Sequence, residues 1–196
     1  MKVTLVCNDI NEETIVELAA PIGLCYLAAY IDRYLPGEFT FKIRHNMNFS
    51  PDDDADIIGI SSMSRYFPEA VRMAREIKAG RDVPVLLGGS HISALPDTLP
   101  DCFDIGVIGE GEETFRELLI LFKEKGEFLP GDLARIKGIS YHQAGEVVTT
   151  PARALITDLD NIPFPRRDLW DLSNRVMWLS SSRGCPFDCV FCAVAR

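Results

Sequence analysis

Short apolar runs alternate with amphipathic stretches along the first 126 residues. Five runs rich in branched apolar residues, each bounded by polar or glycine-containing turns, predict strands at residues 2–7, 39–44, 56–61, 83–87 and 103–108. Three stretches with apolar residues at helical spacing predict helices at residues 21–34, 66–79 and 111–126. This alternation predicts a doubly wound α/β domain, flavodoxin-like or Rossmann-like, with a parallel five-stranded sheet whose short second strand lies at an edge.

A hairpin and a linker follow this domain. Residues 138–142 and 146–150 predict a β-hairpin with a turn at residues 143–145. The next stretch, to residue 171, is rich in proline and charge, which is typical of an extended linker. We therefore expect an α/β domain in residues 1–130, a hairpin and linker in residues 131–175, and the start of another domain in residues 176–196.

Composition and charge narrow the class of protein. The 196 residues are 47% hydrophobic and 25% charged, which is typical of a globular chain, and the net charge of -9 offers no electrostatic footprint for nucleic acid or anionic lipid. The most apolar stretch, residues 15–31, is interrupted by Glu17, Pro21 and Gly23, so we expect no membrane span. Met1 and Lys2 lead directly into a predicted strand without a signal-peptide pattern, so we expect a reducing, cytoplasmic location.

Three cysteines lie in one short loop near the end of the chain. Cys185, Cys189 and Cys192 have C-x3-C-x2-C spacing and follow the strand-like run at residues 177–181. Three thiolates leave a tetrahedral zinc site incomplete, but they can ligate three of the four irons of a 4Fe-4S cluster. The fourth iron is then open to a ligand that is not protein. A partial zinc knuckle or unrelated core thiols are the alternatives, although no further Cys or His follows at finger spacing.

With Phe191 before the last cysteine, this loop resembles the cluster loop of the radical S-adenosylmethionine enzymes. The resemblance implies that the open iron binds S-adenosylmethionine, that Phe191 lies near its adenine, and that a one-electron reductant such as a flavodoxin or ferredoxin is a partner. It also implies a TIM-type barrel, of which residues 176–196 are only the first strand and the cluster loop. We therefore expect the N-terminal part of a longer enzyme, inactive by itself and without catalytic residues of its own.

Small and polar residues follow the predicted strands of the first domain. The carboxyl ends of parallel strands form the ligand-binding edge of such a sheet, where glycines allow close approach and hydroxyl groups can bond a ligand. The candidate residues there are Asn11, Ser61, Ser62, Met63, Gly88, Gly89, Gly109, Glu110 and Gly111.

The order of these elements resembles that of cobalamin-binding domains. In that family a D-x-H-x-x-G, an S-x-L and a GG surround the nucleotide tail of the cofactor, and residues 61–63 and 88–89 match the second and third elements. The first element is unmatched, because Asn11 occupies the histidine position and Thr14 the glycine position. The resemblance therefore implies a base-off cobalamin without a lower histidine ligand, an arrangement that favours methyl transfer over adenosyl chemistry.

Three further motifs are similar to cobalamin-binding domains that precede radical S-adenosylmethionine domains. They are P-x-G-L-x-Y-L-A-A at residues 21–29, G-G-x-H at residues 88–91 and G-E-G-E at residues 109–112. Together the resemblances imply a porphyrin-ester-cyclase-like enzyme that transfers a methyl group, or cyclises or rearranges a small-molecule substrate at an unactivated carbon.

Two other functions remain open. The domain could bind no corrin and serve as a docking or substrate-positioning module, or it could bind a nucleotide or flavin, which would require a phosphate-binding loop after the first strand. Purely structural interpretations of single motifs also remain open: a tight turn at residues 88–89, a helix start at residues 109–112, and a loop or capping role for His91. Three single cysteines are interpreted as core residues: Cys7, Cys25 and Cys102.

Overall fold

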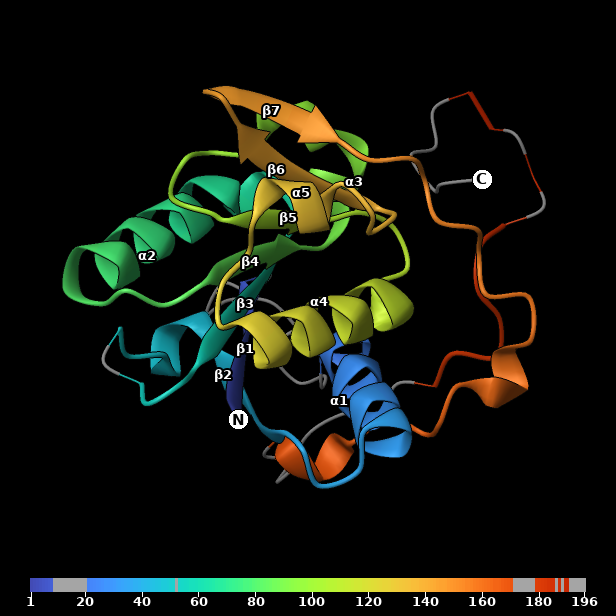
Figure 1. The fold of residues 1–196 in the computed structure, drawn as a ribbon. Helices are drawn as coiled ribbons and strands as arrows, with labels where there is room; N and C mark the ends of the chain where they lie inside the picture. Colours follow the sequence, from blue (N-terminus) through green and yellow to red (C-terminus); the bar gives the residue numbers. More distant parts are fainter. Residues whose placement is uncertain (9–20, 52, 171–178, 186, 188, 191–196) are drawn as a thin grey trace.

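The computed structural model describes residues 1–8, 21–51, 53–170, 179–185, 187, 189 and 190. These residues form a seven-stranded sheet in the order β2-β1-β3-β4-β5-β6-β7 (Figure 1). The first five strands are parallel, and the last two are antiparallel to their neighbours. The strands are β1 (Lys2–Asn8), β2 (Thr40–His45), β3 (Ile57–Ser62), β4 (Val85–Gly88), β5 (Ile105–Val107), β6 (Ile139–Gln143) and β7 (Glu146–Thr149).

The five parallel strands are the five that the sequence predicts, and β2 lies at the edge as expected. Their ends lie within two residues of the predicted ones. Strand β4, for example, begins at Val85 and not at residue 83. Pro84 has no N–H to donate to a neighbouring strand, so it suits the position just before the ladder.

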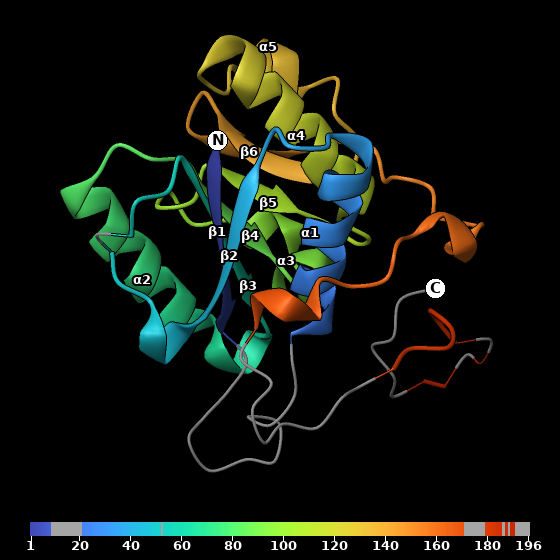
Figure 2. The same cartoon turned by 90° about the horizontal axis from the view of Figure 1, so that it is seen from below.

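Helices cover both faces of the sheet. Figures 1 and 2 show α2 on one side and α1 and α4 on the other, in agreement with two separate hydrophobic cores. The α-helices are α1 (Ile22–Tyr34), α2 (Phe67–Gly80), α3 (Ser90–Ala94), α4 (Glu112–Lys125) and α5 (Pro130–Leu133). Short 3₁₀ turns are η2 (Asn46–Asn48), η3 (Ser64–Tyr66), η4 (Pro96–Thr98), η5 (Leu159–Asn161) and η6 (Arg167–Leu169).

The two cores share the same strands. Because successive side chains of a strand point to opposite faces, Val3 and Leu5 of β1 join the core under α1 and α4, whereas Val6 joins the core under α2 and α3. Strand β4 divides in the same way, with Leu86 on the first face and Leu87 on the second. Alternation within continuous apolar strands thus builds a sheet that is covered on both sides.

The predicted hairpin is present, and it continues the sheet. Strand β6 pairs antiparallel with β5, and the turn to β7 has positive φ at Ala144 (53°) and Gly145 (86°), as a type I′ turn requires. Ile139 and Tyr141 of β6 are fully buried in the core under α1 and α4. The sheet therefore has two more strands than the sequence analysis expected, because the alternating apolar positions of β6 fit the open edge of β5.

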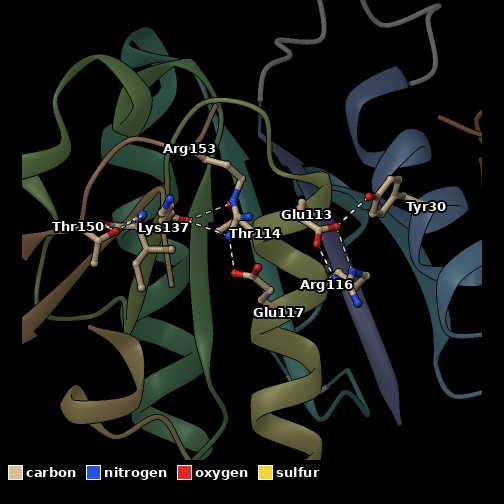
Figure 3. Close-up of polar contacts among 9 residues, drawn as sticks. Tyr30, Glu113, Thr114, Arg116, Glu117, Lys137, Thr150 and Arg153 are labelled. Carbon is tan, nitrogen blue, oxygen red and sulfur yellow. Dashed lines mark hydrogen bonds and ion pairs between the residues drawn. The ribbon is translucent and has the colours of Figure 1, made fainter. Parts of the chain in front are cut away.

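After β7 the chain crosses the outside of α4 and then of α1 with little regular structure, as expected of residues 151–170 (Figure 1). Figure 3 shows Arg153 beside α4, on the side away from Tyr30 of α1, where its Nε donates to Thr114 Oγ1 (2.8 Å) and its guanidinium pairs with Glu117. Further on, the guanidinium of Arg166 pairs with Asp32 of α1, and its backbone N–H donates to the carbonyl of Cys25 (3.0 Å). Specific contacts thus hold the linker against the domain.

None of the helices in the described ranges combines the length and the apolar run needed to cross a bilayer.

Candidate functional site

A cavity of about 370 Å³ opens at the carboxyl ends of the parallel strands. It lies between the sheet and the first turns of α1 and α4, on the face that also holds the α1 and α4 core. This is the edge at which ligands bind in doubly wound sheets, and the volume is within the range of roughly 300–1,000 Å³ typical of small-molecule sites. Its lining is Leu5, Ile22, Gly23, Leu24, Tyr26, Leu27, Gly59, Ile60, Ser61, Leu86, Leu87, Gly88, Gly89, Val107, Gly109, Glu110, Gly111, Glu112, Phe115, Ser180 and Arg183.

The two adjacent glycines after β4 have different roles in the wall of this cavity. A Cβ at Gly89 would lie 2.7 Å from the carbonyl oxygen of Ser62, and its φ of +94° belongs to a region that only glycine adopts freely. A Cβ at Gly88 would meet no atom within 4 Å. Gly89 is therefore required by the close approach to β3, whereas the absent side chain of Gly88 leaves part of the cavity open.

The three residues at the end of β3 do not all reach the cavity. Ser61 lines it. Ser62 is buried, and its Oγ accepts a hydrogen bond from Asn8 Nδ2 (3.2 Å) and donates to the carbonyl of Met63 (3.0 Å). Met63 is 40% exposed and lies outside the lining. Of this triplet, Ser61 is placed to touch a ligand, and Ser62 joins a buried polar network.

That network is centred on Asn8, at the end of β1. Its Nδ2 also donates to the carbonyl of Tyr66 (2.9 Å), and its Oδ1 accepts from Asn46 Nδ2 (3.1 Å). Asn8 is fully buried, and a buried amide requires such partners. These bonds tie the ends of β1 and β3 to the residues that follow β2 and β3, which makes the rim of the sheet rigid on this side.

Gly109, Glu110 and Gly111 lie together in the lining, directly before α4. The two carboxylates of the G-E-G-E motif converge on Arg183, which comes from the cysteine loop. Arg183 Nη1 lies 3.2 Å from Glu110 Oε1, and Nη2 lies 2.5 Å from Glu112 Oε1. Burial disfavours the charged guanidinium, but the two carboxylates more than offset this effect and raise the pKa of Arg183 above its ordinary value.

Arg183 also stacks on Tyr26 of α1. Its Cζ lies 5.3 Å from the centre of the Tyr26 ring, within the range of a cation–π contact. Tyr26, Ser180 and Arg183 line a second cavity, of about 360 Å³, whose other residues come from the linker and from residues 181 and 182. The Arg183–Tyr26 pair therefore stands between the strand-end cavity and a space beside the cysteine loop.

The chain has three histidines, all within the described ranges, and none of them lines the strand-end cavity. His91 lies in α3, with Nδ1 3.0 Å from Ser64 Oγ and its ring stacked on Phe67 at 3.6 Å between centres. Burial lowers the pKa of His91 below its ordinary value. These contacts favour the structural interpretation of this residue over a ligand role.

The cysteines divide into two groups. Cys7, Cys25 and Cys102 are buried, which confirms that they are core residues, and burial raises the pKa of Cys25 to about 11. Cys185 and Cys189 are exposed free thiols. Cys192, Phe191 and Asn11 lie outside the described residues, and among the described ones no group of three or more metal-ligating side chains comes together.

Sequence reasoning missed the roles of Tyr26, Glu112 and Arg183 in this site. A signal was available for Arg183, because a lone cation directly before the Gly184–Cys185 pair could be matched with the two acids of residues 109–112. Tyr26 was visible only as part of the motif at residues 21–29. Neither signal specifies that the three side chains meet, since they are more than 70 residues apart.

Comparison with known proteins relates this chain to a family and to several named relatives. A family model described as B12 binding domain matches residues 10–119. An uncharacterized methyltransferase of Pyrococcus horikoshii is 34% identical over 189 residues, which cover 88% of this chain and 40% of the relative. The anaerobic magnesium-protoporphyrin IX monomethyl ester cyclase of Rubrivivax gelatinosus is 33% identical over 195 residues, covering 88% of this chain and 34% of the cyclase.

The fold has a close match among solved structures. The cobalamin-dependent S-adenosylmethionine radical enzyme OxsB, with aqua-cobalamin and S-adenosylmethionine bound, superposes with a TM-score of 0.75 at 21% identity. The match covers 97% of this chain and 28% of OxsB. The chain thus spans less than half of the length of each of these proteins.

Proposed function

The chain belongs to the B12-binding domain family, and we propose that it is the cobalamin-binding region of a radical S-adenosylmethionine enzyme. The observation that carries this proposal is the strand-end cavity, because six glycines and an apolar wall line it, together with Arg183 and Ser180 of the cysteine-loop segment. In this proposal the cobalamin site and the cluster loop would be neighbours. The two relatives described above, one named as a methyltransferase and one as a cyclase, support the same conclusion.

The cavity suits the nucleotide tail of a cobalamin. Its volume of about 370 Å³ is too small for the whole cofactor but is appropriate for a flat base with its sugar and phosphate. Gly88 leaves space where a side chain would otherwise project, and the Ser61 hydroxyl can bond a polar group of the tail. Apolar side chains such as Leu86 and Val107 supply the remaining wall. The residues present therefore fit this part of the cofactor.

No histidine lines the cavity, and Asn11 stands where the lower ligand is found in other members of the family. We therefore propose that the cofactor is held through its tail and has no protein nitrogen beneath the metal. A bound cobalamin would supply a transferable methyl group or an electron-accepting metal centre. The proposed role of this chain is to bind the nucleotide tail, to exclude water from the apolar wall of the cavity, and thereby to orient the corrin ring.

The cysteine loop would hold the second cofactor. Cys185, Cys189 and Cys192 are proposed to bind three irons of a 4Fe-4S cluster, with S-adenosylmethionine on the fourth and Phe191 near its adenine. A flavodoxin or ferredoxin would supply the electron. The reaction we propose for the whole enzyme is methyl transfer, or oxidative cyclisation or rearrangement, at an unactivated carbon of a small molecule.

Retention of hydroxocobalamin by the purified 196-residue chain tests the proposal. After gel filtration we expect the red-brown chromophore to elute with the protein at a stoichiometry of about one. Gly88→Leu places a side chain in the open part of the cavity, where its Cβ would meet no atom within 4 Å, so it should weaken binding by at least about 100-fold while the unfolding midpoint stays close to that of the parent.

Gly80→Leu is the matched control, because Gly80 ends α2 away from the cavity and a Cβ there also meets nothing within 4 Å. It should bind as the parent does. Absence of the chromophore from the parent chain would favour a docking module that binds no corrin, and equal retention by Gly88→Leu would move the cofactor to another site.

A further inference from the structure

Arg183 joins the cysteine loop to the wall of the strand-end cavity. It lies two residues before Cys185, yet its guanidinium lies at the start of α4, between Glu110 and Glu112. Its side chain is 27% exposed, and the side chain of Glu112 is 6% exposed. A charge as buried as that of Glu112 needs a partner, and Arg183 is the cation paired with it among the described residues.

Glu110 is itself held in place by the linker. Its Oε2 accepts a hydrogen bond from the backbone N–H of Ile156 (2.6 Å), while its Oε1 faces Arg183. The carboxylate is therefore fixed between two downstream segments, the linker and the cysteine loop. A guanidinium that bridges two fixed carboxylates and stacks on Tyr26 has few other orientations available to it. These contacts of the Arg183 guanidinium therefore restrict the positions of the next two residues, Gly184, whose φ is +73°, and Cys185.

The same residues line the cavity. Arg183, Glu110, Glu112 and Ser180 all contribute to its wall, so a ligand in the cavity changes the surroundings of the contact that holds the loop. A ligand that packs against these side chains adds contacts to the docked position of the loop and none to a released one. By linkage, the docked loop must then strengthen the binding of that ligand by the same factor.

We infer that Arg183 is a positioning residue that seats the cysteine loop on the cavity rim and couples the order of that loop to occupation of the cavity by cobalamin. The G-E-G-E motif then acts as the receptor for the loop, in addition to lining the cofactor site. This inference rests on the proposed function for the identity of the ligand, whereas the seating of the loop stands on the ion pairs alone.

Hydrogen exchange of residues 179–185 and titration with hydroxocobalamin together test this inference in the 196-residue chain. In Arg183→Met we expect about 10-fold faster exchange of these amides without ligand and about 10-fold weaker cobalamin binding, within the usual range of coupling between sites. The parent should gain protection at the same amides when cobalamin is added. Arg75→Met removes an exposed arginine of α2 and should change neither quantity.

Two further variants separate positioning from folding. Removing Arg183 alone leaves Glu112 buried without its cation, so Glu112→Gln/Arg183→Met should recover the thermal stability of the parent but not the slow exchange of the loop. Arg183→Lys keeps the charge but not the two-pronged geometry, and should fall between the parent and Arg183→Met.

Parent-like exchange in Arg183→Met would overturn the seating of the loop. Faster exchange with unchanged cobalamin affinity would overturn the coupling. If the parent chain binds no cobalamin, the proposed function fails and the coupling fails with it, but exchange in the unliganded variants still decides whether Arg183 seats the loop.

Discussion

The two faces of the sheet share the same strands but differ at their carboxyl end. On the face covered by α2 and α3, side chains fill the rim: Phe67 stacks on His91, and Asn8 binds Ser62 and the carbonyl of Tyr66. On the face covered by α1 and α4, six glycines line a cavity, and four of them, Gly88, Gly89, Gly109 and Gly111, lie at or just after strand ends. A hollow at the strand ends thus comes from missing side chains on one face, whereas side chains on the opposite face bond and stack with one another.

The largest effect is expected from substituting the two adjacent glycines, Gly88 and Gly89. Gly89→Ala places a Cβ 2.7 Å from the Ser62 carbonyl at a φ of +94°, so we expect a loss of about 2–5 kcal/mol in the free energy of unfolding, from backbone strain and overpacking together. Gly88→Ala should change it by less than about 1 kcal/mol. Urea denaturation of both variants measures the contrast, and equal losses would show that the two positions do not differ in this way.

The next effect concerns the filled face. Phe67→Ala removes a half-buried ring from His91 and from the α2 core, so we expect a loss of about 1–3 kcal/mol in the free energy of unfolding. Cobalamin affinity should stay within about 2-fold, because this ring does not line the cavity. Phe164→Ala is the control, since Phe164 is 92% exposed and its removal should leave stability unchanged. A fall in affinity as large as that of Gly88→Leu would mean that the filled face also contacts the ligand.

The smallest effect is the pH dependence of stability that His91 contributes. Burial lowers the pKa of His91 in the folded chain, whereas the unfolded chain keeps the ordinary histidine pKa. At a pH between these two values the unfolded chain therefore binds more protons than the folded chain. The free energy of unfolding should therefore fall as the pH drops from about 7 toward the lowered pKa, by less than about 1.4 kcal/mol per pH unit for one proton. His91→Gln should flatten this part of the profile, measured by urea denaturation at successive pH values. An unchanged slope would assign it to other groups.

Much of this architecture could be predicted from the sequence because it depends on local patterns. Continuous apolar runs gave the parallel strands, and helical spacing gave the three long helices to within a residue or two at each end. The resemblance to cobalamin-binding domains is confirmed by the family match over residues 10–119. The hairpin was predicted as a pair of strands, but its place in the sheet was not, since pairing with β5 is a contact between distant segments.

The site was predicted less completely than the fold. Gly88, Gly89 and Ser61 reach the cavity as expected, because the residue after each strand is fixed by topology alone. Ser62 does not, since alternation along β3 turns its side chain to the opposite face from Ser61. Met63 does not either, since it comes after the last residue of β3. The meeting of Tyr26, Glu112 and Arg183 depends on how the linker folds back over α1 and α4, and no local pattern encodes that path.

The hairpin has a practical consequence for anyone who trims this protein. Strand β5 is three residues long, and its outer edge is covered by β6. A shortened version that stopped where the family match stops, at residue 119, would cut through α4 and leave the backbone amides of β5 free to recruit a strand from another molecule. A soluble minimal domain should extend at least through Thr150, whose backbone N–H donates to the carbonyl of Ile139 and closes the hairpin.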